Sequence, residues 1–213
     1  PQPLISRDSV YGVGGRVDSR GTVRRELDAE EIRAVLASIA GRGFDGGVVS
    51  FLNAYRNPEH EHLVKSLAQD AFPDLAVTCS ADVWPVVREY ERTLTAVLNA
   101  YVEPRMGRYL GSFRGRLAEV GVPAELQVTK SNGGVMSAAL GEKSGVQVLL
   151  SGTASGVIGA CHVARAAGLR EVVSLDIGGT SADVALIVDG EPEYGIGQQV
   201  GEFVLHVPAV QVS

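Results

Sequence analysis

Cysteine is scarce in this chain of 213 residues, which contains only Cys79 and Cys161. Neither belongs to a Cys-x-x-Cys pair, and no spacing of Cys and His is typical of a zinc site. A disulfide framework is therefore excluded, and we expect two reduced, buried thiols in a cytoplasmic protein.

Positive charge is also in short supply. Lys and Arg total 19 against 25 Asp and Glu, which gives a formal net charge of -6. General nucleic-acid binding needs basic stripes, so we expect no nucleic-acid partner. The most apolar stretch, residues 146–169, contains His162 and Arg165 and many small residues, so we expect no membrane span. The start, Pro1-Gln2-Pro3, lacks the basic and apolar regions of a signal peptide.

The remaining composition is that of a globular protein, with 45% hydrophobic and 21% charged residues. The first residue is not Met, and the sequence stops at Val210-Gln211-Val212-Ser213, in the middle of an apolar strand-like run. We therefore expect a piece of a longer protein.

Helix and strand signals alternate along residues 28–79. Asp28 and Glu31 have the spacing of a helix cap ahead of an apolar helical face, and Asn57-Pro58 begins a second helix. Buried strands are predicted at 48–52 and 75–79. This order indicates a layered α/β fold.

The second half continues with mixed elements. Two helices are predicted on either side of Pro104, the second of them ending at Gly121. A strand at 126–129 runs into the loop Ser131-Asn132-Gly133-Gly134, and a helix of small residues follows at about 154–167. Two strands, 172–176 and 184–188, then flank a tight Gly-Gly turn.

The turn carries the clearest chemical signal, Asp176-Ile177-Gly178-Gly179-Thr180-Ser181-Ala182-Asp183. Successive backbone N–H groups in such a turn form a concave anion site, and glycine leaves room for a ligand to approach closely. The hydroxyls of Thr180 and Ser181 can add donors. Asp176 and Asp183 cannot bind phosphate themselves, but they can hold a magnesium ion that neutralises a nucleotide.

Other interpretations of the same residues exist. A plain β-hairpin also favours a Gly-Gly turn on conformational grounds. The pattern is neither a Walker A loop nor a dinucleotide fingerprint, because it has no Gly-Lys-Ser/Thr and its glycines lead into a strand. His60 and His62 lie two residues apart and so predict no metal pair, and Arg92 is expected on a solvated or salt-bridged helix face.

Asp-x-Gly-Gly-Thr between two strands, after a helix of small residues, resembles the second phosphate segment of actin-like ATPases. Further segments resemble the hydantoinase A/5-oxoprolinase/acetone carboxylase family, in matching order over nearly the whole chain. They are residues 50–61, 88–93 with 99–101, 130–137, 151–160 and 176–186. The family usually has Ser-Gly-Pro-Ala-Gly-Gly where this chain has Ser-Gly-Thr-Ala-Ser-Gly at 151–156.

The resemblance implies an α/β fold of the actin-like ATPase (ribonuclease H-like) type, incomplete at both ends. Residues 1–168 would be the C-terminal part of a first actin-like domain, with an insertion at about 88–150. Residues 171–213 would begin a second such domain with the phosphate hairpin. Gly178, Gly179, Thr180, Ser181, Asn132 and Gly133 would bind the cofactor, and Asp176 and Asp183 the metal; no catalytic residue is assigned.

The implied function is that of one subunit of an ATP-dependent cyclic amide hydrolase, which uses ATP and Mg²⁺ to phosphorylate a carbonyl oxygen. A second, hydantoinase B-like subunit or domain would complete the enzyme. One alternative is a subunit of an ATP-dependent ketone carboxylase. Another, of a different class, is an actin-like module that holds nucleotide without turnover.

Overall fold

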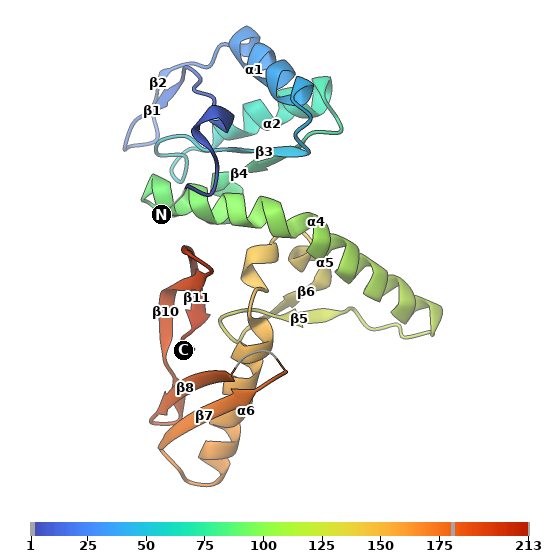
Figure 1. Cartoon of the computed structure of the whole chain (residues 1–213), viewed down its shortest axis with the longest axis vertical. Helices are drawn as coiled ribbons and strands as arrows, with labels where there is room; N and C mark the ends of the chain where they lie inside the picture. Colours follow the sequence, from blue (N-terminus) through green and yellow to red (C-terminus); the bar gives the residue numbers. More distant parts are fainter. Residues whose placement is uncertain (1–2, 180–181, 213) are drawn as a thin grey trace. The chain divides into compact units, whose positions relative to one another are not determined.

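The computed structural model describes residues 3–179 and 182–212 (Figure 1). The chain divides into two compact units, Pro1–Ala100 and Tyr101–Ser213. The boundary between these units, at residues 100–101, differs from the boundary that we predicted near residues 168–171. The predicted boundary separates two actin-like domains rather than two compact units, and it stays a prediction.

The first unit contains the predicted alternation of helices and strands. Its elements are η1 (Arg7–Ser9), β1 (Arg16–Val17), β2 (Val23–Arg25), α1 (Ala29–Gly41), β3 (Gly46–Val49), α2 (Glu59–Ala71), β4 (Ala76–Cys79), α3 (Ser80–Val83) and the first part of α4 (Glu89–Glu119). β1 and β2 form an antiparallel hairpin, while β3 and β4 pair in parallel. Both strands of the parallel pair are shorter than predicted.

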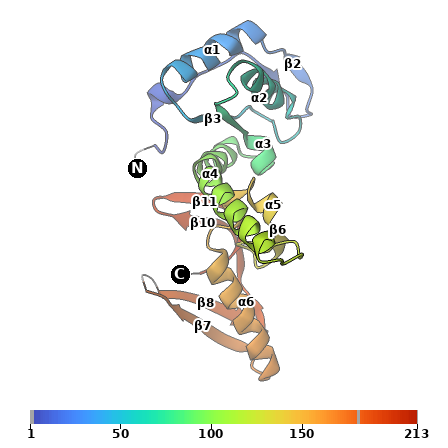
Figure 2. The ribbon, with the colours of Figure 1, turned by 90° about the vertical axis from the view of Figure 1, so that its right-hand side faces the viewer.

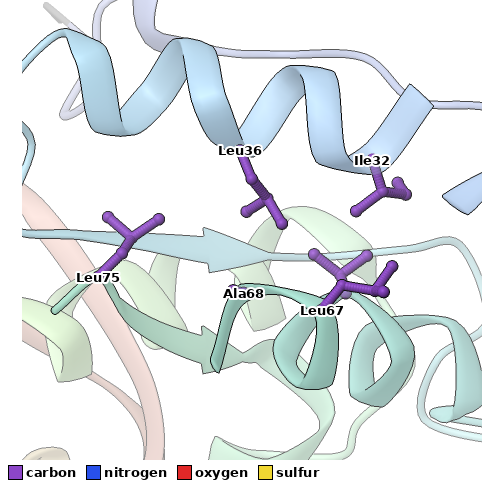
Figure 3. Close-up of a cluster of buried hydrophobic side chains, with 6 residues drawn as sticks. Ile32, Leu36, Leu67, Ala68 and Leu75 are labelled. Carbon is purple, nitrogen blue, oxygen red and sulfur yellow. The ribbon is translucent and has the colours of Figure 1, made fainter. Parts of the chain in front are cut away.

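The core of this unit lies between α1, α2 and the start of β4. Figure 3 shows its apolar side chains, which come from one face of each helix. They are Ile32, Leu36, Val64, Leu67, Ala68 and Leu75. Asp28 caps α1 as predicted, because its side chain accepts hydrogen bonds from the N–H groups of Glu30 and Glu31. Glu31 does not complete a capping box, since its carboxylate accepts instead from the Gly14 N–H at 2.9 Å.

A buried polar network joins α2, α3 and α4 in this unit. Arg92 is fully buried, so its predicted place on a solvated or salt-bridged face is wrong. Its guanidinium donates to the carbonyls of Phe51 and Val86 and to the hydroxyl of Ser80. Ser80 in turn donates to the buried carboxylate of Glu61 at 2.7 Å. Buried charges persist in proteins when hydrogen bonds satisfy them, as they do here.

Helix α4 is one continuous helix of 31 residues with Pro104 inside it. The prediction of two helices with a joint at Pro104 is therefore wrong. A proline within a helix removes one hydrogen bond and costs about 3 kcal/mol. Packing on both sides of it offsets this cost, since Leu94 and Leu98 before it and Leu110 after it are buried.

The second unit contains short antiparallel sheets and the helices α5 and α6 together with the second part of α4. After the rest of α4 come β5 (Gln127–Thr129), β6 (Val135–Ser137), α5 (Ala138–Gly141), η2 (Gly145–Gln147), α6 (Ser151–Ala166), β7 (Glu171–Ile177), β8 (Ala182–Val188), β9 (Glu191–Pro192), β10 (Tyr194–Val200) and β11 (Phe203–Val210). β7, β8 and β9 form an antiparallel sheet, and β10 pairs with β11. Figure 2 shows α6 lying along β7 and β8.

The core of the second unit lies between α6 and these strands. Ala154, Val157 and Cys161 from α6 pack against Ala185 and Ile187 of β8 and against Val210. Both cysteines of the chain are free and buried, as predicted. Burial raises the pKa of the Cys79 thiol to about 12, so this thiol is protonated at neutral pH.

Among the described residues, Gly145–Ala166 is the one stretch long and apolar enough to cross a membrane by length and composition alone. It is not one helix, because Leu150 adopts a left-handed conformation (φ 58°) between η2 and α6. α6 itself has 16 residues, fewer than the roughly 20 that a span needs. Its apolar face packs on β8 and Val210, which favours a core helix over a membrane helix.

We expect Glu89 to make the first unit sensitive to acid. The Asn53 N–H donates to the Glu89 carboxylate at 3.1 Å, and this hydrogen bond lowers the pKa of Glu89. A carboxyl whose pKa is lowered by folding contributes stability above its unfolded pKa of about 4.3, and loses it as pH falls through the lowered value. The Glu89→Gln variant should therefore lose less stability between pH 6 and pH 3 than the parent protein. Urea unfolding followed by the fluorescence of Trp84, the one tryptophan, measures this loss.

Glu119→Gln is the matched control, because Glu119 is exposed at the end of α4. An acid profile of Glu89→Gln identical to that of the parent and of this control would contradict the assignment.

Candidate functional site

The segment with the strongest sequence signal is an antiparallel hairpin. β7 and β8 pair in the register Leu175↔Val184, Asp176↔Asp183 and Ile177↔Ala182. Gly178 and Gly179 follow β7 directly, so the predicted hairpin with these glycines at its turn is confirmed. Thr180 and Ser181 lie outside the described residues.

Asp176 and Asp183 face each other across the two strands on the side that α6 covers. Side chains alternate along a strand, so Asp183 shares its face with Ala185 and Ile187, which pack against α6. Directly opposed residues in an antiparallel pair have Cβ atoms about 4.5–5.5 Å apart. The register therefore places two carboxylates side by side on this face.

The first two turns of α6 lie against this carboxylate pair. Thr153 Oγ1 donates to Asp183 Oδ2 at 3.3 Å. Asp176 Oδ2 lies 3.6 Å from the position that a Cβ on Gly156 would occupy. α6 thus lies close to both aspartates: the Thr153 hydroxyl bonds to Asp183, and the absence of a side chain at Gly156 leaves room for Asp176.

The start of α6 offers free donors beside the pair. No side chain caps this helix, whose preceding residue is Leu150. The N–H groups of Ser151 and Ala154 bond to the carbonyls of Val148 and Leu150, but those of Gly152 and Thr153 bond to no described backbone carbonyl. Free N–H groups and the helix dipole make a helix N-terminus favourable for an anion.

The residues that depart from the family pattern, Thr153 and Ser155, both lie within the helix. Ser155 Oγ donates to the Ser151 carbonyl at 2.7 Å, which is a local bond within the first turn. Thr153 contributes the bond to Asp183. In spite of the departure from the family pattern, α6 still begins at this segment, and Thr153 supplies a hydrogen-bond donor to the Asp183 carboxylate.

The described part of the fold gives no conformational or steric reason for glycine at position 179. Its φ lies outside the left-handed region, and no described atom lies within 4 Å of the position that a Cβ would take. Open space over the backbone next to two carboxylates and a helix N-terminus is what a bound phosphate with its cation would use.

The opposed carboxylates favour a cation between them. Like charges directly opposite in a sheet are destabilising, and a bound cation removes this repulsion. Among the residues that the structure describes, no group of three or more His, Cys, Asp or Glu side chains could hold a metal. Two carboxylates suit Mg²⁺, which usually keeps several waters and completes its shell with phosphate oxygens.

Asn132 and Gly133 occupy a different place. They lie in the β5–β6 turn, where Asn132 Oδ1 accepts from the Gly134 N–H at 3.0 Å. Gly133 has φ 77°, and a Cβ there would lie 2.6 Å from Cγ1 of Ile158 on α6. At about 100° per residue, Ile158 is about 140° round α6 from Thr153 and about 200° from Gly156. The turn thus packs on another flank of α6 than the carboxylate pair, and the fold itself accounts for Gly133.

The sequence analysis did not place Thr153 or Gly156 beside the aspartates. Thr153 bonds to Asp183, and a Cβ on Gly156 would lie 3.6 Å from Asp176 Oδ2, yet the sequence analysis noted only that residues 151–156 depart from the family pattern. The available signal was their position, because a helix that immediately precedes a hairpin in the sequence packs on it.

Comparisons with known proteins identify the family of the chain. The hydantoinase/oxoprolinase family model matches residues 92–213, and the model of the hydantoinase/oxoprolinase N-terminal region matches residues 1–72. The first match covers more than half of the chain. The chain belongs to the hydantoinase/oxoprolinase family.

Its relatives include both amide-cleaving enzymes and carboxylases. Caprolactamase subunit alpha of Pseudomonas jessenii is 32% identical over 99% of this chain, and acetophenone carboxylase gamma subunit of Aromatoleum aromaticum is 36% identical over 89%. A nucleotide-free structure of acetone carboxylase, an ATP-dependent enzyme, matches 100% of this chain with a TM-score of 0.91 and 30% identity. The chain spans 30%, 26% and 30% of these three chains, respectively.

We expect the carboxylate pair to respond to Mg²⁺. In the absence of divalent cations, Asp176→Asn should stabilise the β7–β8 hairpin by about 0.2–1 kcal/mol, because one of two opposed charges is gone. Mg²⁺ should raise the thermal midpoint of the parent protein and should change that of the variant little. Hydrogen exchange of the β7 and β8 amides, measured with EDTA and with Mg²⁺, follows the effect locally.

The matched control is Asp189→Asn, because Asp189 is an exposed carboxylate just after β8 that pairs with Arg170. It should keep the response to Mg²⁺. Equal responses in the parent and in Asp176→Asn would remove the case for a cation at the pair.

Proposed function

We propose that this chain forms part of an enzyme subunit that binds ATP and Mg²⁺, with the β7–β8 hairpin as one wall of the nucleotide site. The observation that carries the proposal is the pair Asp176–Asp183 beside the N-terminus of α6, with an unobstructed Gly179 at the turn. A metal held by the carboxylates and donors from backbone N–H groups are complementary to nucleotide phosphates.

In this proposal the site residues have separate roles. The backbone of Gly178 and Gly179, with the hydroxyls of Thr180 and Ser181, binds phosphate oxygens. Asp176 and Asp183 hold Mg²⁺ directly or through water. Asn132 and Gly133 would bind nucleotide from their own flank of α6, at a different part of the molecule from the phosphates. The fold is that of an actin-like ATPase, with residues 1–168 and 171–213 contributing to two domains.

The proposed reaction is ATP-dependent hydrolysis of a cyclic amide. An amide carbonyl is a poor electrophile, and transfer of a phosphoryl group to its oxygen makes the carbon open to attack by water. ATP is the phosphoryl donor and ADP the leaving group of this transfer. Attack of water on the activated carbon then breaks the ring C–N bond and releases inorganic phosphate, and a bound Mg²⁺ would supply positive charge beside the transferred group. The family match and the relative named caprolactamase support this substrate class.

Ketone carboxylation is the second candidate. The relative named acetophenone carboxylase and the structural match to acetone carboxylase support it as strongly as the hydrolase is supported. Both reactions begin with the same phosphoryl transfer to an oxygen, so the hairpin serves either. In both cases we propose a cytoplasmic hetero-oligomer in which a second, hydantoinase B-like subunit or domain completes the enzyme.

An actin-like module that binds nucleotide without turnover is the remaining candidate. Steady-state ATP hydrolysis by the longer protein separates the three. Stimulation by hydantoins or 5-oxoproline identifies the hydrolase, and stimulation by a ketone with bicarbonate identifies the carboxylase. ATP binding without hydrolysis under any of these conditions identifies the module.

For residues 1–213 alone, we expect weak ATP binding and no hydrolysis. A phosphoryl-transfer site needs donors held around the phosphate on all sides, and one wall supplies only part of the required stabilisation. Calorimetry with ATP and Mg²⁺, beside a phosphate-release assay, tests this. Micromolar binding with steady turnover by this chain would show that the site is misplaced.

The Gly179→Val variant tests the phosphate contact directly. Its side chain would enter space free of described atoms, so stability should be unchanged while ATP binding falls at least about tenfold, a loss of about 1.4 kcal/mol. Gly159→Ala is the control, because Gly159 is equally unobstructed on α6 and lies away from the turn. Unchanged ATP affinity in a folded Gly179→Val protein would contradict the proposed contact.

A further inference from the structure

The second part of α4, residues 101–119, carries aromatic rings on its solvent side. Tyr101 is 68% exposed, Tyr109 65% and Phe113 42%. The rings of Tyr109 and Phe113 stack on each other with their centroids 6.4 Å apart. The Arg105 guanidinium lies over the Tyr101 ring, 5.3 Å from its centroid. Contacts between neighbouring side chains therefore order this surface, although the rings lie outside the core.

These side chains lie on the side of α4 opposite to the one that packs on the rest of the second unit. The packed side holds Leu110, which is buried and lies 3.1 Å from the position of a Cβ on Gly141, and Arg114, which bonds to Glu142. At about 100° per residue, the exposed positions fall within about 140° of the helix circumference. We call them the aromatic–arginine face, which consists of Tyr101, Arg105, Arg108, Tyr109, Phe113 and Arg116.

This part of α4 is a poor helix former by its sequence. Pro104, Gly107, Gly111 and Gly115 each destabilise a helix interior relative to alanine. Within residues 101–119 only Leu110 is buried. Most of the stability of a helix in a protein comes from tertiary packing. A second packing surface on the exposed side would therefore stabilise this segment.

The charge of the segment restricts what can cover it. Residues 101–119 contain four Arg and two Glu, a net charge of +2, whereas the whole chain has a net charge of -6. Arg108 and Arg116 are exposed and form no hydrogen bond or ion pair with a described residue. A second copy of the face would oppose arginine with arginine, which disfavours self-association. Guanidinium groups pair with carboxylates through two parallel hydrogen bonds, so the charge indicates an acidic partner.

The mixture of side chains favours a protein over a membrane. Tyr, Phe and Arg are enriched in the centres of protein interfaces, and Tyr and Arg among the residues that carry most binding energy. A helix that lies on a membrane surface keeps its cationic and its apolar residues on different faces. Here Arg105 lies between Tyr101 and Tyr109 in one row of residues four apart.

We propose that the aromatic–arginine face docks an acidic amphipathic helix of a partner protein. Apolar side chains of that helix pack between the three rings, and its carboxylates pair with the three arginines. Rows of residues four apart on one helix form grooves that receive the ridges of another helix. The face extends about 22 Å along α4, which is room for about four turns. α4 contributes no strand to the β7–β8 hairpin, so the proposal goes beyond the nucleotide site and does not rest on it.

The experiment measures the binding of a dye-labelled model peptide to the full chain by fluorescence anisotropy. The peptide is a helix of about 18 residues of Leu, Ala and Glu, in which glutamates flank one row of leucines. We expect saturable binding that weakens as the NaCl concentration rises. Replacement of every glutamate of the peptide by glutamine should weaken binding at least about tenfold, because the pairs with the arginines are lost.

Two pairs of variants locate the binding surface. Tyr109→Ala should weaken peptide binding at least about tenfold. Tyr194→Ala is its control and should leave binding unchanged, because Tyr194 is an equally exposed tyrosine on β10. Arg116→Gln should weaken binding at least about threefold. Arg20→Gln, the control at an exposed arginine of the first unit, should have no effect.

Circular dichroism checks that each variant is folded. Absence of saturable binding, equal binding of the glutamine peptide, or unchanged binding in folded Tyr109→Ala and Arg116→Gln would overturn the proposal. Phosphatidylserine vesicles or oligouridylate that bind more tightly than the peptide, and lose this binding in Tyr109→Ala, would assign the face to a membrane or to RNA instead. A dimer seen by sedimentation equilibrium and abolished by Tyr109→Ala would assign it to a second copy of the chain.

Discussion

The feature on which the proposed nucleotide site depends is the confrontation of two like charges, Asp176 and Asp183, across the β7–β8 ladder. The register sets their separation, and the packing of Ala185 and Ile187 against α6 sets the face on which they lie. A shift of one residue in register would move every side chain of one strand to the other face. The apolar contacts of α6 therefore hold the two carboxylates close together in spite of their mutual repulsion. A cation bound between them would offset this repulsion.

The same helix brings donors to this charge pair. Thr153 bonds to Asp183, Gly156 lets Asp176 approach, and the N–H groups of Gly152 and Thr153, in the first turn of the same helix, bond to no described backbone carbonyl. One helix thus supplies the packing that fixes the hairpin and the dipole that favours an anion. Since both effects come from α6, core substitutions such as Val157→Ala should disturb cation binding as well as stability.

Much of the local structure could be predicted because it depends on short-range signals. The Asp28 cap, the β-branched runs on either side of Gly178-Gly179 and the helix of small residues each determine their element from neighbouring residues. Arg92 and Pro104 were misjudged because tertiary contacts decide them. Buried carbonyls and Ser80 surround Arg92, and packing on both sides carries α4 through Pro104. The spacing of apolar residues along the sequence predicts neither the burial of Arg92 nor the continuation of α4 through Pro104.

The site was predicted in part for the same reason. The hairpin is a local feature, and its pairing could be predicted from the sequence. The flank of α6 on which Asn132 and Gly133 lie depends on how β5 and β6 pack, so the sequence could not separate them from the phosphate turn. In the sequence His60 is an ordinary residue at a helix start, and only the structure shows that it is buried with no hydrogen-bond partner among the described residues.

The most direct test of the account is a crystal structure of the longer protein with a non-hydrolysable ATP analogue and Mn²⁺ in place of Mg²⁺. The account predicts phosphate oxygens within hydrogen-bond distance of the Gly178 and Gly179 N–H groups, and an anomalous Mn²⁺ signal beside Asp176 or Asp183, directly or through one water. Phosphates separated from this turn by more than a water layer, with the metal elsewhere, would contradict it.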